Sequence, residues 1–245
     1  FPESLKKSIL QEAVQGKLVP QDPSDEPAEA LLGRIRAEKQ RLIKEGKIKK
    51  DKHESAIFRR DNSHYEKLNG VERCIDDELP FEIPPQWCWV RFESTITLLS
   101  GTDFAPDEYN SAGKGIAYIT GASNIVDSQI LVNRWTETPR QIAHAGDVLL
   151  VCKGSGYGKT VICNIAQAHI ARQIMAVQKS DLLDMQYVKL FLDSSFDLLK
   201  AKGQGVIPGI DRTSVLHLLF PLPPLAEQHR IVQRIEELLP LVKGL

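Results

Sequence analysis

"GDVLLVCKGSGYGKTVICNI", residues 146–165, is the stretch that decides the fold class of this chain. Two short apolar runs flank a glycine-rich turn that ends in Gly158-Lys159-Thr160, as a phosphate-binding P-loop does. A P-loop has the pattern G-x-x-x-x-G-K-[ST] and continues into a helix. Here Lys153 stands where the first glycine of that pattern belongs, and the β-branched run TVICNI that follows predicts a strand. The stretch therefore predicts a β-hairpin with a flexible, basic tip.

Three interpretations of this hairpin follow from the sequence. It is a plain surface turn, the phosphate site of a P-loop-like nucleotide-binding enzyme, or a loop that contacts nucleic acid. Residues 128–180 carry six basic and two acidic residues, whereas residues 70–110 carry nine acidic and two basic residues. The net charge of −1 therefore conceals a segregation that favours a basic face around the hairpin.

The composition is typical of a folded protein with a buried core, because 42% of the 245 residues are hydrophobic and 26% are charged. The sequence contains no run of about 18 apolar residues, and its opening lacks the pattern of a secretory signal peptide. The four cysteines are scattered, without the C-x-x-C spacing of a zinc site, which is typical of reduced thiols. We therefore expect a cytoplasmic protein without membrane contact and without a metal.

The hydrophobic pattern divides the chain into four segments. Residues 1–52 predict a helix, a polar turn and a second helix, and residues 53–74 predict a linker. Residues 75–223 contain short apolar runs that predict strands, with one clear helix over residues 185–201. Residues 224–245 predict the start of a long helix. The expected fold class is α+β: a mainly β domain with one internal helix, flanked by terminal helices of coiled-coil type.

Apolar side chains recur on one face of each terminal helix. In the C-terminal helix they are separated by four, three and four residues, which suits a coiled-coil seam and also ordinary core packing. We expect the two ends of the chain to pack against each other or against another subunit. The side chains expected in these contacts are Leu5, Ile9, Leu31, Ile35, Leu42, Ile231, Ile235, Leu238 and Val242.

Two flanking stretches resemble the specificity subunit of type I restriction–modification enzymes. "PLPPLAEQHRIVQRIEELL" (221–239) is similar to the entry of that family's conserved helix, and residues 8–50 resemble the region that precedes a target recognition domain. "SGTDFAPDEYNSAGKGIAYIT" (100–120) resembles the family's Gly-Thr-x-x-x-Pro loop and the strand after it, although Ala117 stands where the family usually has Pro. The glycine hairpin also resembles a family segment, so the resemblance covers nearly the whole chain.

The resemblance implies a non-catalytic subunit that reads one half of a bipartite double-stranded DNA site. Such a subunit docks methyltransferase (modification) subunits and, through them, the translocase and nuclease subunits. S-adenosylmethionine, ATP and Mg²⁺ would belong to those partners, so this chain would have no cofactor and no catalytic residue. The residues agree with this, because neither "IPPQW" nor "LPPLA" supplies the Asn/Asp-Pro-Pro-aromatic motif of a DNA-amino methyltransferase.

DNA reading requires cations for phosphates and polar side chains on loops for base edges. The glycine hairpin and the later loop "AKGQGVIPGIDRTS" (201–214) supply both. The rival hypotheses are the nucleotide-binding enzyme and a purely structural coiled-coil interaction module. Trp87 and Trp89 are expected in the core. The residues predicted to contact DNA are Lys153, Ser155, Tyr157, Lys159, Thr160, Arg134, Arg172, Lys202, Gln204, Arg212 and Thr213.

Overall fold

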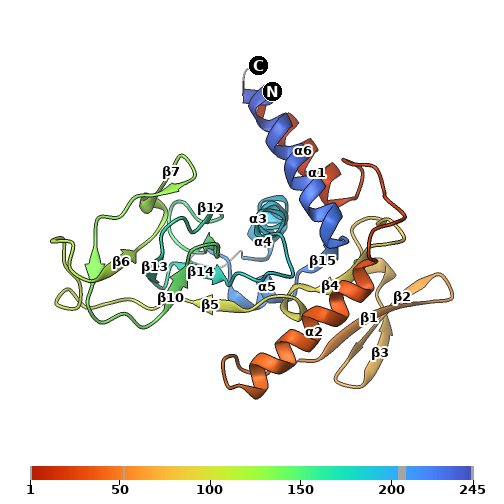
Figure 1. The fold of residues 1–245 in the computed structure, drawn as a ribbon, viewed down its shortest axis with the longest axis horizontal. Coiled ribbons are helices and arrows are strands. Elements are labelled where there is room, and N and C mark those ends of the chain that lie inside the picture. The colour runs from red at the N-terminus through yellow and green to blue at the C-terminus, as the bar shows by residue number, and fades with distance from the viewer. Residues whose placement is uncertain (1, 52, 204–207, 244–245) are drawn as a thin grey trace. The chain divides into compact units, whose positions relative to one another are not determined.

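The computed structural model describes residues 2–51, 53–203 and 208–243, and the chain divides into two units (Figure 1). The first unit comprises Phe1–Thr95, Leu182–Tyr187 and Leu216–Leu245. The second unit comprises Ile96–Asp181 and Val188–Val215 and is therefore inserted into the first. None of the helices that the structure describes combines the length and the apolar character that a bilayer span requires.

The first unit contains the terminal helices and two small sheets. Its elements are α1 (Pro2–Val14), α2 (Ala28–Lys44), β1 (Ser55–Arg60), β2 (Ser63–Leu68), β3 (Val71–Cys74), η1 (Asp76–Glu78), β4 (Cys88–Arg91), η2 (Phe92–Ser94), β15 (Leu219–Leu222) and α6 (Leu225–Lys243). Strands β1, β2 and β3 form one antiparallel sheet, and β4 pairs with β15 in another. The stretch expected as a linker, 53–74, thus contains three strands, whose mostly polar residues hid them from the hydrophobic pattern.

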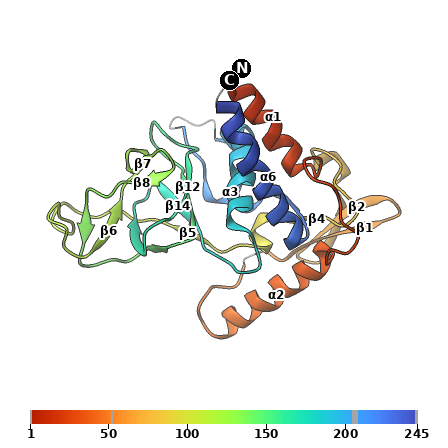
Figure 2. The same ribbon diagram turned by 45° about the horizontal axis from the view of Figure 1, so that its top comes forward.

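Helices α1 and α6 lie side by side, as both views of the ribbon show (Figures 1 and 2). The two ends of the chain therefore pack against each other. On α6, three of the expected seam residues are buried and Leu238 is half-buried; on α1, Leu5 and Ile9 are only half-buried. In α2, two expected residues are buried and Leu42 is half-buried. The buried side chains of the three helices include Leu10, Ala13, Val14, Leu31, Ile35, Ile231, Ile235 and Val242.

The second unit is mainly β. Its elements are β5 (Leu98–Ser100), β6 (Ile116–Ile119), η3 (Ala122–Asn124), β7 (Ile125–Val126), β8 (Gln129–Ile130), β9 (Trp135–Thr136), β10 (Ile142–His144), β11 (Val148–Val151), β12 (Thr160–Ile162), β13 (Gln167–Ile170), β14 (Ile174–Val177) and α4 (Phe196–Lys202). Two further helices cross the boundary between the units along the chain: α3 (Met185–Ser194) and α5 (Arg212–Leu216).

One core cluster joins the two four-stranded sheets of the second unit. In the sheet β12-β11-β14-β5, the two central strands have uninterrupted apolar sequences and every side chain of both is buried. In the sheet β10-β13-β6-β9, β13 and β6 are parallel and the other pairs are antiparallel. Leu149 and Ile174 from the first sheet share a cluster with Ile119 and Ile170 from the second. The expected α+β class with a mainly β domain is confirmed.

The helix predicted over residues 185–201 is interrupted, so the expectation of one internal helix was wrong. Ser195 stands between α3 and α4, and the hydroxyls of Ser194 and Ser195 both donate hydrogen bonds of 2.8 Å to the carbonyl oxygen of Phe191. Side-chain bonds to a carbonyl in the preceding turn compete with the helical pattern and bend helices. The apolar periodicity continues across the break and therefore did not reveal it.

Candidate nucleic-acid interface

The glycine hairpin predicted at 146–165 is present, and it is not a P-loop. Strands β11 and β12 pair antiparallel, with Leu149 opposite Val161. After Lys159 the chain enters β12 directly, where a P-loop would begin a helix. A strand, rather than the N-terminus of a helix, therefore follows this turn directly.

Each glycine of the hairpin tip packs closely against another segment of the second unit. Gly154 and Gly158 have φ values of +86° and +94°, which side-chain-bearing residues rarely adopt. A Cβ atom on Gly158 would collide with the Phe196 ring, and one on Gly156 would collide with the side chain of Ala122. The glycines thus let the hairpin tip pack against other segments of its own unit. These contacts hold the tip in place, whereas the sequence had predicted a flexible tip.

Two residues predicted to contact DNA face helices instead. The Tyr157 ring lies edge-on to Phe196, with centroids 5.8 Å apart. The Thr160 hydroxyl donates a hydrogen bond to Asp193 in α3, and the other carboxylate oxygen of Asp193 lies 2.8 Å from Lys189 Nζ. The hydroxyl of Thr160 is therefore used inside the protein, beside a carboxylate that would repel a phosphate.

Three segments meet at Cys152, which lies just before the hairpin tip. The Cys152 N–H donates a hydrogen bond of 2.7 Å to the carbonyl oxygen of Gln173, and its own carbonyl oxygen accepts one of 2.8 Å from Ile210 N–H. Lys153 also forms a β-bridge with Gly209. We call the hairpin tip 152–159, the turn 171–173 and the loop 208–213 the loop cluster. These backbone bonds hold the two loops that the sequence singled out next to each other.

The loop cluster exposes most of its predicted DNA contacts. Arg172 is 72% exposed and lies 3.4 Å from Asp103, and Arg212 donates a hydrogen bond of 3.0 Å to the Ser100 hydroxyl. Lys202 ends α4 beside the cluster and is exposed. Gln204 lies outside the described residues. The exposed members are Lys153, Ser155, Lys159, Arg172, Arg212 and Thr213.

Arg134 lies outside the three segments of the loop cluster, in an aromatic patch that the sequence did not reveal and that packs with Ala171 of the cluster's turn. Its guanidinium is 5.1 Å from the centroid of the Tyr109 ring. In the same patch, Arg140 lies 4.4 Å over the Phe104 ring and 3.0 Å from Glu108. An aromatic ring attracts a cation over its face through its quadrupole. These two arginines are exposed and pre-positioned, although Arg140 already has an acidic partner.

A buried histidine anchors the loop that carries this patch. His169 accepts hydrogen bonds at Nδ1 from the N–H groups of Arg140 (3.1 Å) and Gln141 (3.2 Å). Its Nε2 therefore carries the proton and donates to the carbonyl oxygen of Thr102 at 2.7 Å. Burial lowers the pKa of His169, so the ring stays neutral at physiological pH. Its role is to hold the loop that starts at Thr102, and it has no free nitrogen for catalysis.

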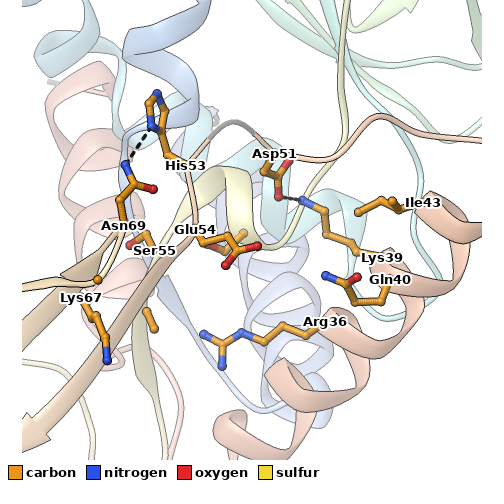
Figure 3. Close-up of a pocket in the computed structure, with 13 residues that line it drawn as sticks. Arg36, Lys39, Gln40, Ile43, Asp51, His53, Glu54, Ser55, Lys67 and Asn69 are labelled. Carbon is orange, nitrogen blue, oxygen red and sulfur yellow. Dashed lines mark hydrogen bonds and ion pairs between the residues drawn. The ribbon is translucent and has the colours of Figure 1, made fainter.

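A cavity of about 450 Å³ lies within the first unit, between α2 and the start of the three-stranded sheet (Figure 3). Lys39 is only 9% exposed and reaches Asp51 at 2.8 Å and the carbonyl oxygen of Glu93 at 2.5 Å. Arg36 and Lys67 also line the cavity, and neither forms an ion pair with any acidic residue that the structure describes. Because these two cationic side chains are unpaired, the cavity is better suited to binding an anionic group than a cation. Within the described part of the chain, no three His, Cys, Asp or Glu side chains are arranged to hold a metal.

Curated relatives align with almost the whole chain. The type I restriction enzyme EcoAI specificity subunit of Escherichia coli is 32% identical over 97% of the chain, and the EcoEI specificity subunit of the same organism is 31% identical over 97%. The alignments cover 40% and 39% of those proteins, so the chain spans about two fifths of their length. No protein-family model matches the chain.

Solved structures of the type I restriction–modification system share the fold. The HsdS subunit from Thermoanaerobacter tengcongensis gives a TM-score of 0.59 at 23% identity, over 89% of this chain and 50% of that chain. A chain from a structure of complex assembly and conformational transition in the type I R-M system gives a TM-score of 0.61, with the same identity and coverage. By its sequence over nearly its full length, and in agreement with its fold, the chain belongs to the specificity subunits of type I restriction–modification enzymes.

Proposed function

We propose that this chain is the DNA-reading part of a specificity subunit and recognises one half of a bipartite double-stranded site. The loop cluster carries this proposal. Its three segments are fixed to each other by backbone hydrogen bonds at Cys152, and together they expose the cations Lys153, Lys159 and Arg172 beside polar side chains. Cations hold DNA phosphates and polar side chains read base edges, so a rigid surface that offers both is suited to sequence recognition.

We further propose that the chain performs no chemistry and takes no cofactor itself. Methyltransferase subunits, with the translocase and nuclease subunits beyond them, would supply S-adenosylmethionine, ATP and Mg²⁺ and would be docked through the terminal helices. The pairing of α1 with α6 supports a structural role for these helices. The nucleotide-binding alternative is disfavoured because strand β12 follows Lys159 and the Asp193 carboxylate lies against Thr160. A millimolar ATP titration by calorimetry should give no heat of binding.

The decisive experiment replaces side chains of the loop cluster without disturbing its glycines. A triple alanine variant at Lys153, Ser155 and Lys159, placed in the full-length protein, should lose site-specific binding to duplexes drawn from a randomised library. A Lys47→Ala variant, which alters an exposed cation of the first unit, is the control and should bind as the wild type does. A triple variant that selects the wild-type sequence with the wild-type affinity would favour the view that the second unit is only a spacer.

A further inference from the structure

Gln173 lies in the middle of the loop cluster, and its backbone is fixed from both sides. Its carbonyl oxygen accepts the 2.7 Å hydrogen bond from Cys152 N–H, and the turn is closed by a 2.9 Å bond from Ile174 N–H to the carbonyl oxygen of Ala171. The preceding N–H, that of Arg172, donates to the Asp103 carboxylate at 2.9 Å. The position of Gln173 is therefore set by its own turn and by two other segments of the second unit, at Cys152 and at Asp103.

Two glycines leave room for the side chain of Gln173. A Cβ atom on Gly121 would lie 2.6 Å from Gln173 Oε1, and one on Gly154 would lie 3.2 Å from the same oxygen. The side chain thus rests between two stretches of bare backbone, yet Gln173 is exposed. Its amide group has no hydrogen-bond partner among residues 2–51, 53–203 and 208–243. An exposed, unpaired amide whose oxygen packs against the backbone of two glycines is free to bond with a ligand, and it loses less side-chain entropy on binding than an amide with no such contacts.

We propose that Gln173 is a specificity-determining residue that reads one base pair in the major groove and prefers adenine. This inference rests on the proposed function. A side-chain amide carries one donor and one acceptor, which match the N7 acceptor and N6 donor of adenine in a bidentate pair. Lys153 and Arg172 belong to the same loop cluster, and their charges are suited to phosphates, which carry no sequence information. Gln173 therefore supplies base discrimination, and its neighbours supply attraction.

The test uses the full-length protein that contains this chain, together with the partners with which it is purified. Duplexes are selected from a randomised library by the wild type, by Gln173→Ala and by Gln173→Glu. Gln173→Ala should lose about tenfold or more of the preference at one base pair and keep the others. Gln173→Glu keeps the shape but offers only acceptors, so the same position should change from adenine towards cytosine, whose N4 amino group is a donor.

A second variant tests the position of the side chain without removing it. The backbone of Gly121 is extended (φ 170°), so Gly121→Ala strains no dihedral angle and displaces only the far end of the Gln173 side chain. It should weaken the preference at the same base pair as Gln173→Ala. Gln167→Ala is the matched control. Gln167 is also an exposed glutamine, but it stands at the first position of β13, whereas Gln173 lies in the turn after the last. Gln167→Ala should leave every preference unchanged.

The outcomes separate this inference from the proposed function. If the wild type selects no sequence, the proposed function and the inference both fail. If the wild type selects a sequence and Gln173→Ala and Gln173→Glu select the same one with equal preference at every position, only the inference fails. A uniform loss of affinity for all duplexes would likewise overturn it, since that result assigns Gln173 to the phosphate backbone or to folding.

Discussion

The indole Nε1 of Trp87 donates a 2.9 Å hydrogen bond to the carboxylate of Glu227, 140 residues further along the chain. Both side chains are buried, and Gln21 Nε2 donates to the other carboxylate oxygen at 2.5 Å. Glu227 is the acidic residue of the "LAEQ" sequence that resembled the family. Its structural role is to tie the start of α6 to the turn after α1 and to the strand region at Trp87.

Loss of this bond should destabilise the first unit in a pH-dependent way. Burial raises the pKa of Glu227 in the folded state. At low pH the carboxyl group is protonated and its burial costs no stability. The free energy of unfolding falls as the pH rises through the folded-state pKa, because a charged carboxylate must then be buried. Trp87→Phe removes a donor that stabilises the charged form, and should cost roughly 1.5–3 kcal/mol at pH 8 but less at pH 5. Urea denaturation at both pH values measures this difference.

Trp89→Phe is the matched control for that prediction. Trp89 is also buried, but its Nε1 has no hydrogen-bond partner within the described structure. Its replacement should cost stability through lost packing, by the same amount at pH 5 and pH 8. Equal pH dependence in the two variants would show that the bond to Glu227 contributes nothing specific.

Acid should weaken the attachment of the three-stranded sheet. Glu66 is 1% exposed, and bonds of 2.8 and 2.9 Å from Arg91, together with Ser55 and Arg73, lower its pKa to about 2. A depressed folded-state pKa contributes stability above the unfolded value of about 4.5, and this is lost as pH falls towards 2. The wild type should therefore lose roughly 3 kcal/mol more than Glu66→Gln between pH 6 and pH 2.

Thermal unfolding followed by circular dichroism across this pH range measures the loss. Glu72→Gln, on the neighbouring strand β3, controls for the removal of one negative charge and should behave as the wild type. Parallel acid curves for the wild type and Glu66→Gln would contradict the assignment.

The collision predicted at Gly158 can be separated from its backbone strain. Gly158→Ala combines a left-handed φ of +94° with a clash against Phe196, and should destabilise the second unit by roughly 2–4 kcal/mol. Gly113→Ala also has a positive φ, +77°, but its Cβ would meet nothing within 4 Å, so it should cost only about 1 kcal/mol. Equal losses in chemical denaturation would mean that the hairpin tip is not packed on α4.

Lys159 should act as a phosphate contact without sequence preference. Lys159→Ala is expected to weaken binding to all duplexes and to lower the slope of log K against log salt by roughly one, because one fewer counterion is released. Fluorescence anisotropy between 50 and 200 mM salt, roughly the range over which such contacts are lost, measures the slope. An unchanged slope would remove Lys159 from the interface.

The sequence predicted those features that depend on local pattern. The hairpin followed from β-branched runs around glycines, and the two terminal helices from apolar spacing. The three-stranded sheet was missed although Asn69-Gly70 is a strong hairpin signal, because its strands are too polar to show alternation. Thr160 was predicted to contact DNA, and no local pattern could reveal its hydrogen bond to Asp193, which lies 33 residues away in α3.

For a related reason, the sequence did not single out Gln173. Nothing in "ARQIMAV" marks its glutamine, since its distinction comes from bare backbone at Gly121 and Gly154, which only the folded chain brings to it. The loops were predicted, but which of their side chains remain available is decided by pairings between distant segments.

The alternation within the hairpin tip has a consequence for the DNA recognition proposed above. Positions 154, 156 and 158 are restricted to glycine by a left-handed backbone, by the atoms that a Cβ would meet, or by both, whereas the side chains at 153, 155 and 159 are exposed. Side chains at 153, 155 and 159 can therefore be exchanged without disturbing the contacts that the three glycines make. If these positions contact DNA as proposed, exchanging them changes the recognised sequence while the fold of the hairpin stays the same.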